Sequence, residues 1–179
     1  MASAELLLHP VRLRVVQAFL GERTLTTSDL RDELPDVPVA TLYRHVGVLA
    51  GAGVLEVVGE RKVRGASERS YRLDLAAASV ASEDAAGMTA DEHRNAFTTF
   101  AAALMADFDR YVARAAADGA PPDLARDRVG YRQAAVWVTD TEFDGMVTEL
   151  AAVVRARMEN RADGARRRRM ITTVHLPAD

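Results

Sequence analysis

The sequence predicts an α+β fold, mainly α, in which a small helical unit with a β-hairpin precedes a long helix and a strand-helix-strand unit. Three observations predict it. Residues 38–53 place apolar side chains at helical spacing between a proline and two glycines. Threonine followed three residues later by Asp or Glu, typical of helix starts, occurs at Thr26, Thr89 and Thr139. Short β-branched or alternating runs lie between the predicted helices.

The helix predicted over residues 38–53 has one apolar side and one polar side. Leu42, Val46 and Leu49 recur at i, i+4 and i+7, so they should face a core. The residues on or beside the opposite face carry donors that phosphates and base edges accept: Thr41, Tyr43, Arg44 and His45. For His45, the sequence is equally compatible with a side chain that bonds locally on its helix.

A shorter helix is predicted just before it, from Thr26 to about Leu34. Thr26 can serve as N-cap, Asp29 lies near the positive end of the helix dipole, and Pro35 ends the helix. Residues 35–38 form only a tight turn, so the two helices should cross steeply, as in a helix-turn-helix.

A hairpin is predicted next, with strands at residues 54–58 and 70–73 and a polar tip between them. Its cations Arg61, Lys62 and Arg64 are placed to neutralise phosphates without reading sequence. The alternative is an ordinary solvated hairpin tip.

The order of these segments resembles a known family. Residues 9–16, 26–30, 40–46, 49–53 and 64–71 are similar to the winged helix-turn-helix of ArsR-like bacterial transcriptional regulators, and the resemblance covers residues 9–74. It implies that the second helix enters the major groove of double-stranded DNA while the hairpin, or wing, follows the backbone. The implied DNA-binding residues are Val39, Thr41, Tyr43, Arg44 and His45 on the helix, and Arg61, Lys62, Arg64 and Arg69 on the wing.

Composition narrows the class of protein. The 179 residues are 49% hydrophobic, enough for a proper core, and contain no cysteine, which excludes disulfides, thiolate metal sites and thiol nucleophiles. The longest run without a charge, residues 95–106, is too short to span a membrane, and no signal-peptide pattern opens the chain. We therefore expect a cytoplasmic protein without membrane contact. The net charge of −3 means that DNA binding must depend on local placement of cations.

The domain division expected is a winged helix-turn-helix domain at residues 1–74, a linker at 75–88 and a dimerisation or effector domain at 89–179. The capping box at Thr89 opens a long helix to Asp118. Its apolar stripe is Phe97, Phe100, Ala101, Leu104, Phe108, Tyr111, Val112 and Ala115. Because this stripe is longer than a small core needs, we expect a homodimer through the helix Thr89 to Asp118.

The remaining residues predict a strand at 131–139, a helix opened by the Thr139 capping box, and a last strand at 170–176. This order resembles the extension that follows the winged domain in many actinobacterial ArsR-like regulators. The metal-sensing cysteines of that family have no counterpart in this sequence, and His93 beside Asp91 and Glu92 does not make a metal site. The arginine run at 166–169 is predicted to pair with acidic neighbours, the alternative being a contact with flanking DNA.

One set of side chains has two interpretations. Aromatic and methionine residues on the long helix and the last unit could line a pocket for a small apolar effector, or could simply fill the core. They are Phe97, Phe100, Met105, Tyr131, Trp137, Phe143 and Met146.

No catalytic motif stands out: the chain lacks a phosphate-binding glycine loop, a Gly-x-Ser-x-Gly elbow and a His-Glu-x-x-His pair. We expect no enzyme and no cofactor. The first hypothesis is a homodimeric, sequence-specific transcriptional regulator, a repressor because a dimer that occludes a promoter needs no further machinery. The second is a winged-helix protein interaction module without specific DNA binding, which the acidic balance favours.

Overall fold

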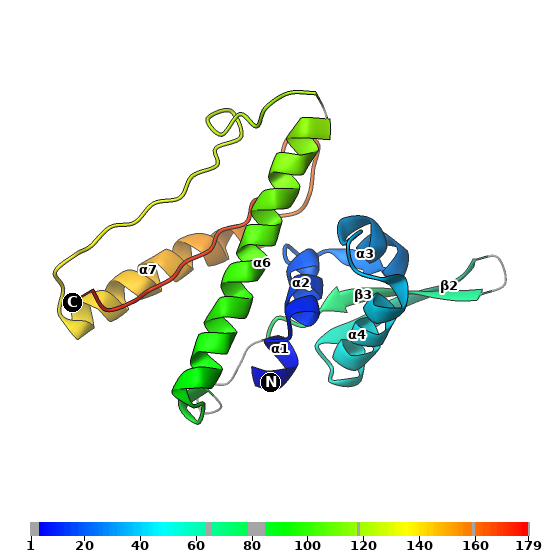
Figure 1. Cartoon of the computed structure of the whole chain (residues 1–179), viewed down its shortest axis with the longest axis horizontal. Helices are drawn as coiled ribbons and strands as arrows, with labels where there is room; N and C mark the ends of the chain where they lie inside the picture. Colours follow the sequence, from blue (N-terminus) through cyan, green and yellow to red (C-terminus); the bar gives the residue numbers. More distant parts are fainter. Residues whose placement is uncertain (1–3, 64–65, 79–84, 118, 159, 179) are drawn as a thin grey trace. The chain divides into compact units, whose positions relative to one another are not determined.

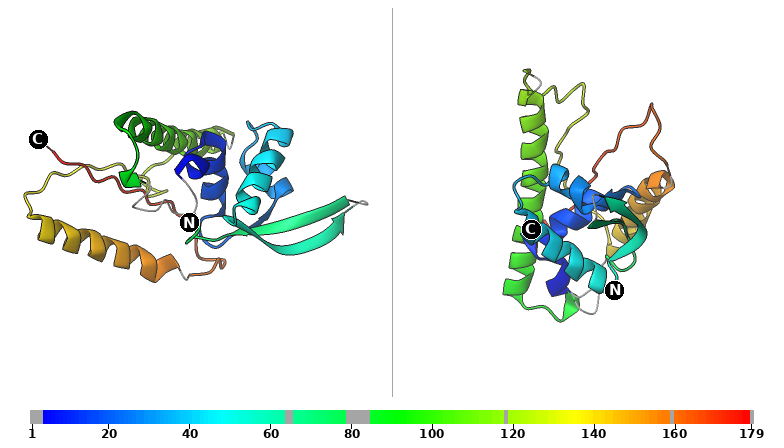
Figure 2. Two further views of the ribbon diagram at one scale, coloured as in Figure 1. Left: turned by 90° about the horizontal axis from the view of Figure 1, so that it is seen from below. Right: turned by 90° about the vertical axis from the view of Figure 1, so that its right-hand side faces the viewer.

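The computed structural model describes residues 4–63, 66–78, 85–117, 119–158 and 160–178 and divides into two compact units, residues 1–122 and 123–179. The first unit (Figures 1 and 2) contains helices and a small sheet. Its elements are α1 (Ala4–Leu7), α2 (Pro10–Phe19), β1 (Thr24–Thr26), α3 (Thr27–Glu33), α4 (Val39–Gly51), β2 (Leu55–Val63), β3 (Ala66–Leu73) and α6 (Ala90–Ala117). The long helix therefore lies in the same compact unit as the predicted winged domain.

The three strands form one antiparallel sheet in the order β1-β3-β2. Leu25 pairs with Tyr71, and Leu55 pairs with Leu73, so the base of the sheet lies against the helices. The register shifts between Val57 and Gly59, which marks a β-bulge where the hairpin leaves the body of the unit. Both strands are longer than predicted: β2 continues past residue 58 to Val63, and β3 begins at Ala66 rather than at residue 70. The hairpin projects past α3 and α4 (Figure 1).

The core lies between α2, α3, α4 and the base of the sheet. Its fully buried large side chains are Val15, Phe19, Leu30, Leu34, Leu42, Val46, Leu49, Val54 and Leu55. The predicted seam of α4 is thus confirmed, because its three residues are all inside. Burying one such side chain contributes about 1.5–3 kcal/mol, so the seam fixes how α4 is rotated about its axis.

The three predicted helix starts are confirmed. Thr26 Oγ1 accepts from the Asp29 amide at 3.1 Å, while the Asp29 carboxylate accepts from the Thr26 amide at 2.8 Å. The same reciprocal pattern joins Thr89 to Glu92 and Thr139 to Glu142. These bonds lower the pKa of the Asp29 carboxyl, because they stabilise its charged form.

Helix α6 packs against α2 through a narrow face on which Ala103 is buried. Much of the predicted apolar stripe stays outside: Phe97, Leu104 and Phe108 are between 41% and 50% exposed. Within the described ranges, no helix has both the length and the apolar character needed to cross a membrane.

The second unit contains α7 (Asp140–Met158), the helix predicted after Thr139. The strand predictions on either side are wrong for the single chain, since residues 131–139 and 170–176 form no strand. The reason is that alternation specifies which side chains share a face, whereas a strand also needs a neighbouring backbone to bond with. Trp137 is fully exposed and α7 has no buried residue, so this unit has little core of its own.

Candidate nucleic-acid interface

The outward face of α4 is set by its buried seam. With Leu42, Val46 and Leu49 inside, Tyr43 (57% exposed) and Arg44 lie on the solvent side, together with Val39 at the start of the helix. Thr41 is half-buried at the edge of this face. Four of the five predicted helix residues therefore lie on or beside the exposed surface of α4.

Gly47 lies on the same face, one turn after Tyr43 and Arg44. A Cβ added there would meet no heavy atom within 4 Å, so no internal packing requires a glycine. Glycine in a helix interior costs roughly 0.5–1 kcal/mol relative to alanine. The missing side chain leaves an open stretch of backbone next to Tyr43 and Arg44, which suits a helix that must approach a partner surface closely.

His45 is not on this face. It is only 4% exposed, and its ring stacks on that of His9, with centroids 4.4 Å apart. The prediction of His45 as a DNA contact is therefore corrected: a buried imidazole offers no edge to a groove. The local alternative holds instead, since Nε2 of His45 lies 3.4 Å from Nη2 of Arg44.

The surroundings of the two histidines lower both pKa values, which favours the neutral rings. Burial lowers the pKa of His45, and the neighbouring His9, Arg44 and Arg12 lower it further. Burial, followed by Arg12 and Arg44, also lowers the pKa of His9, whose Nδ1 accepts from the Val11 amide. Because a guanidinium only donates, its contact with Nε2 assigns the proton of His45 to Nδ1, a buried atom without a hydrogen-bond partner. His45 thus links the start of α2 to the exposed Arg44.

The turn between α3 and α4 is tied to α2. Arg14 donates from both terminal nitrogens to the two carboxylate oxygens of Asp36, each at 2.7 Å. This two-pronged bond lowers the pKa of the Asp36 carboxyl. Since Asp36 lies in the turn before Val39, the ion pair helps to set where α4 begins.

Two arginines of the wing form ion pairs with glutamates on the facing strand. Arg61 donates from Nε to Glu68 at 2.8 Å, and Arg69 lies 3.8 Å from Glu60 on the facing strand. Both arginines stay more than half exposed, and Lys62 is exposed as well. Arg64 lies outside the described residues. The sequence placed these cations on a tip, whereas Arg61, Lys62 and Arg69 lie on the strands themselves.

The residues of the predicted apolar pocket are distributed over both units. Phe97, Phe100 and Met105 lie on α6, and the first and last of these are at least half exposed. Tyr131 and Trp137 lie in the second unit at 79% and 103% exposure. Phe143 and Met146 are partly buried on α7, where Phe143 contacts the ring of His175 edge-on. The exposed members are not enclosed as a ligand pocket would require.

Comparison with known proteins agrees with this geometry. Residues 7–58 match the model of a family described as a helix-turn-helix domain. The chain contains a helix-turn-helix domain. The match spans α2, α3, α4 and the first part of β2, and a domain of this kind indicates a DNA-binding regulator. A search of curated proteins finds no match to the chain.

Two structural links escaped the sequence reasoning. His45 lies three residues after Leu42 and four before Leu49, so the same helical spacing that identified the seam could have placed it on the inner side. The Arg14–Asp36 pair joins residues 22 positions apart, and no local pattern signals such a contact.

Proposed function

We propose that this protein binds double-stranded DNA in a sequence-specific way, with α4 in the major groove and the β2–β3 wing along the backbone. The observation that carries the proposal is the outward face of α4, where Tyr43, Arg44 and the bare backbone at Gly47 lie over a seam locked in the core. A helix that enters a groove needs such a face, since the groove admits a helix only with its side chains on the base edges.

Arg44 and the wing cations would have different roles in DNA binding. A guanidinium can bridge O6 and N7 of guanine, so Arg44 is the candidate for reading sequence. Lys62 is exposed on the wing and has no ion pair within the described ranges, which suits a phosphate contact that positions the protein. Arg61 and Arg69 would first have to leave Glu68 and Glu60.

A homodimer would present two such helices to one side of the duplex. The proposed contact is the uncovered side of α6, which leaves Phe97, Leu104, Met105 and Phe108 exposed at 41% to 68%. Apolar side chains in helical spacing along one long helix favour packing against the same helix of a second copy. Two α4 helices would then lie about 34 Å apart, on half-sites roughly ten base pairs apart.

We further propose an ArsR-like repressor, since a bound dimer can occlude a promoter without other machinery. The decisive experiment selects bound fragments from random DNA with the full chain, followed by footprinting of the enriched sequence. An enriched inverted repeat with half-sites spaced by one helical turn supports the proposal. Fragments with no shared sequence, or a protected half-site bound by a monomer, would count against specific binding or against the dimer.

The second candidate is a winged-helix protein interaction module without specific DNA binding, with the long helix as its functional surface. The ion pairs of Arg61 and Arg69 favour it, because paired cations attract phosphates less strongly. A gel-shift series with unlabelled competitor separates the two functions. An interaction module forms no complex that survives excess random DNA, whereas a sequence-specific regulator does.

A further inference from the structure

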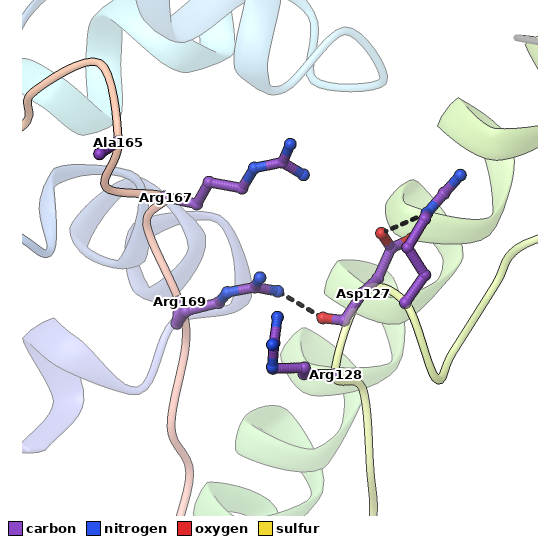
Figure 3. A pocket seen from close by; sticks show the side chains of 6 residues that line it. Asp127, Arg128, Ala165, Arg167 and Arg169 are labelled. Atoms are coloured by element: carbon purple, nitrogen blue, oxygen red, sulfur yellow. Dashed lines mark hydrogen bonds and ion pairs between the residues drawn. The ribbon is translucent and has the colours of Figure 1, made fainter.

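The second unit contains a hollow lined mainly by arginine. Two irregular segments, residues 126–128 and 165–169, border a cavity of about 550 Å³. Its lining residues are Arg126, Asp127, Arg128, Ala165, Arg167 and Arg169. In Figure 3 the side chains of Arg167 and Arg169 extend from one segment toward Asp127 and Arg128 on the other.

Each segment is shaped by an aspartate-capped turn. Asp123 accepts from the Arg126 amide at 2.9 Å, and the amides of Arg128 and Val129 close back onto Ala125 and Leu124. This closing pattern normally takes glycine at the position where Arg128 stands with φ of +52°. A left-handed conformation is costly for a residue with a side chain, so a long cation occupies a site where glycine would be less strained.

The opposite segment is organised in a similar way around Asp163. Its carboxylate accepts from the amides of Ala165 and Arg166 at 2.9 Å and 2.8 Å, and it also pairs with the Arg166 guanidinium. Arg166 is thereby held at the turn. The side chains of Arg167 and Arg169 are the ones that line the hollow.

The charges of the lining do not cancel. The carboxylate of Asp127 is engaged by Arg126, with Nε at 3.0 Å from one oxygen and Nη2 at 3.1 Å from the other. Arg169 donates to the main-chain carbonyl of Asp127, which is neutral. Arg128 and Arg167 have no carboxylate in ion-pair contact within the described ranges. Four arginines against one aspartate leave an excess of three positive charges around the hollow.

We propose that this hollow binds a small, multiply charged phosphate compound. Guanidinium groups match phosphate oxygens in a two-pronged geometry, and several guanidiniums brought together without a counter-charge repel one another until an anion joins them. Ligand sites in proteins have volumes of roughly 300–1,000 Å³, so a cavity of about 550 Å³ accommodates a metabolite-sized anion. The site is distinct from the proposed DNA-binding face and does not depend on it.

The chemistry differs from that of the apolar effector expected from the sequence. Tyr131 and Trp137, two of the aromatic side chains named for that effector, are exposed, whereas charged side chains line the hollow. The sequence predicted that the arginines of residues 166–169 form ion pairs with acidic neighbours. In the structure Arg166 pairs with Asp163 whereas Arg167 lines the hollow, an arrangement that a phosphate ligand explains.

The test is titration calorimetry of the full chain with inorganic tripolyphosphate, comparing the native protein with the double variant Arg128→Ala and Arg167→Ala. The matched control is Arg132→Ala with Arg155→Ala, which removes the same charge from exposed positions of the same unit outside the hollow. Each lost charge-assisted bond weakens binding about tenfold, so the double variant should bind roughly a hundredfold more weakly. The control should stay within about twofold of the native protein.

Circular dichroism checks that α7 remains helical in both double variants, so that lost binding is not lost folding. Equal affinity in all three proteins, or no heat of binding in any, would overturn the proposal. A parallel measurement with random duplex DNA distinguishes a second source of phosphate. If the double variant loses affinity for the duplex while tripolyphosphate never binds, these arginines belong to the DNA backbone contact and the small-anion site is refuted.

Discussion

Replacing Gly47 by alanine should move stability and DNA binding in opposite directions. The substitution adds one methyl group on the exposed face of α4, where nothing lies within 4 Å of the new carbon. The helix therefore gains the usual difference between glycine and alanine, roughly 0.5–1 kcal/mol. For a chain of this size that corresponds to a rise in melting temperature of about 1–4 °C.

The same methyl group should obstruct the groove. If α4 approaches base edges as closely as a packed interface requires, an added carbon costs about 1–3 kcal/mol, as overpacking does in cores. Affinity for the selected DNA should then fall roughly 5- to 150-fold. Thermal unfolding and fluorescence anisotropy with the selected duplex, on the same preparation, measure both effects.

The control is Gly145→Ala on α7, another helix-interior glycine with open space around its added carbon. It should leave DNA affinity unchanged. If Gly47→Ala is more stable yet binds the duplex as tightly as the native protein, α4 does not approach DNA by this face and the proposed docking is wrong. If it is less stable, the reasoning from open space fails instead.

Four further substitutions test the site and the residues that support it. Arg44→Ala should cost roughly 1–3 kcal/mol of binding free energy and relax the base preference. Lys62→Ala should weaken the binding of all DNA sequences alike and reduce the slope of log affinity against log salt concentration by about one. Indistinguishable specificity profiles of the two variants would refute this division of roles. His45→Phe should lessen the acid sensitivity of folding: with its pKa lowered from 6.5, native His45 resists the proton that the unfolded chain accepts, so stability falls as pH drops below 6.5. Urea unfolding over that range should show a flatter profile in the variant, and parallel profiles would contradict it. Thr26→Ala removes the cap of α3 and should destabilise the protein by about 1 kcal/mol in urea. Because the pKa of Asp29 lies below its usual 3.8, the part of this contribution in which the Thr26 hydroxyl donates to the Asp29 carboxylate should be lost only as the pH falls through this lowered value.

The features predicted correctly from the sequence are those that depend on residues a few positions apart. Thr26, Thr89 and Thr139 were identifiable as helix starts because each cap joins residues three positions apart. The inward seam of α4 was identifiable for the same reason, since helical spacing alone brings its residues onto one side. The hairpin was also predicted, although its strands proved longer because cross-strand pairs such as Arg61 with Glu68 extend them.

What the sequence left open depended on partners far along the chain. The ring of His45 contacts that of His9, which lies far away in the sequence, and the bond of Arg14 to Asp36 helps to set the start of α4. Residues 131–139 have the alternation of a strand but no backbone beside them to complete one.

The sequence by itself therefore determined the caps, the apolar seam of α4, and the order of α3, α4, the hairpin, α6 and α7, all of which depend on residues a few positions apart. Only the tertiary structure decided that His9 contacts the buried His45, that Phe97, Leu104 and Phe108 of the apolar stripe of α6 stay exposed, and that arginines from two segments far apart in the sequence surround one hollow. The physical reason is that burial and charge clustering depend on which distant segments fold together, and local spacing does not encode that choice.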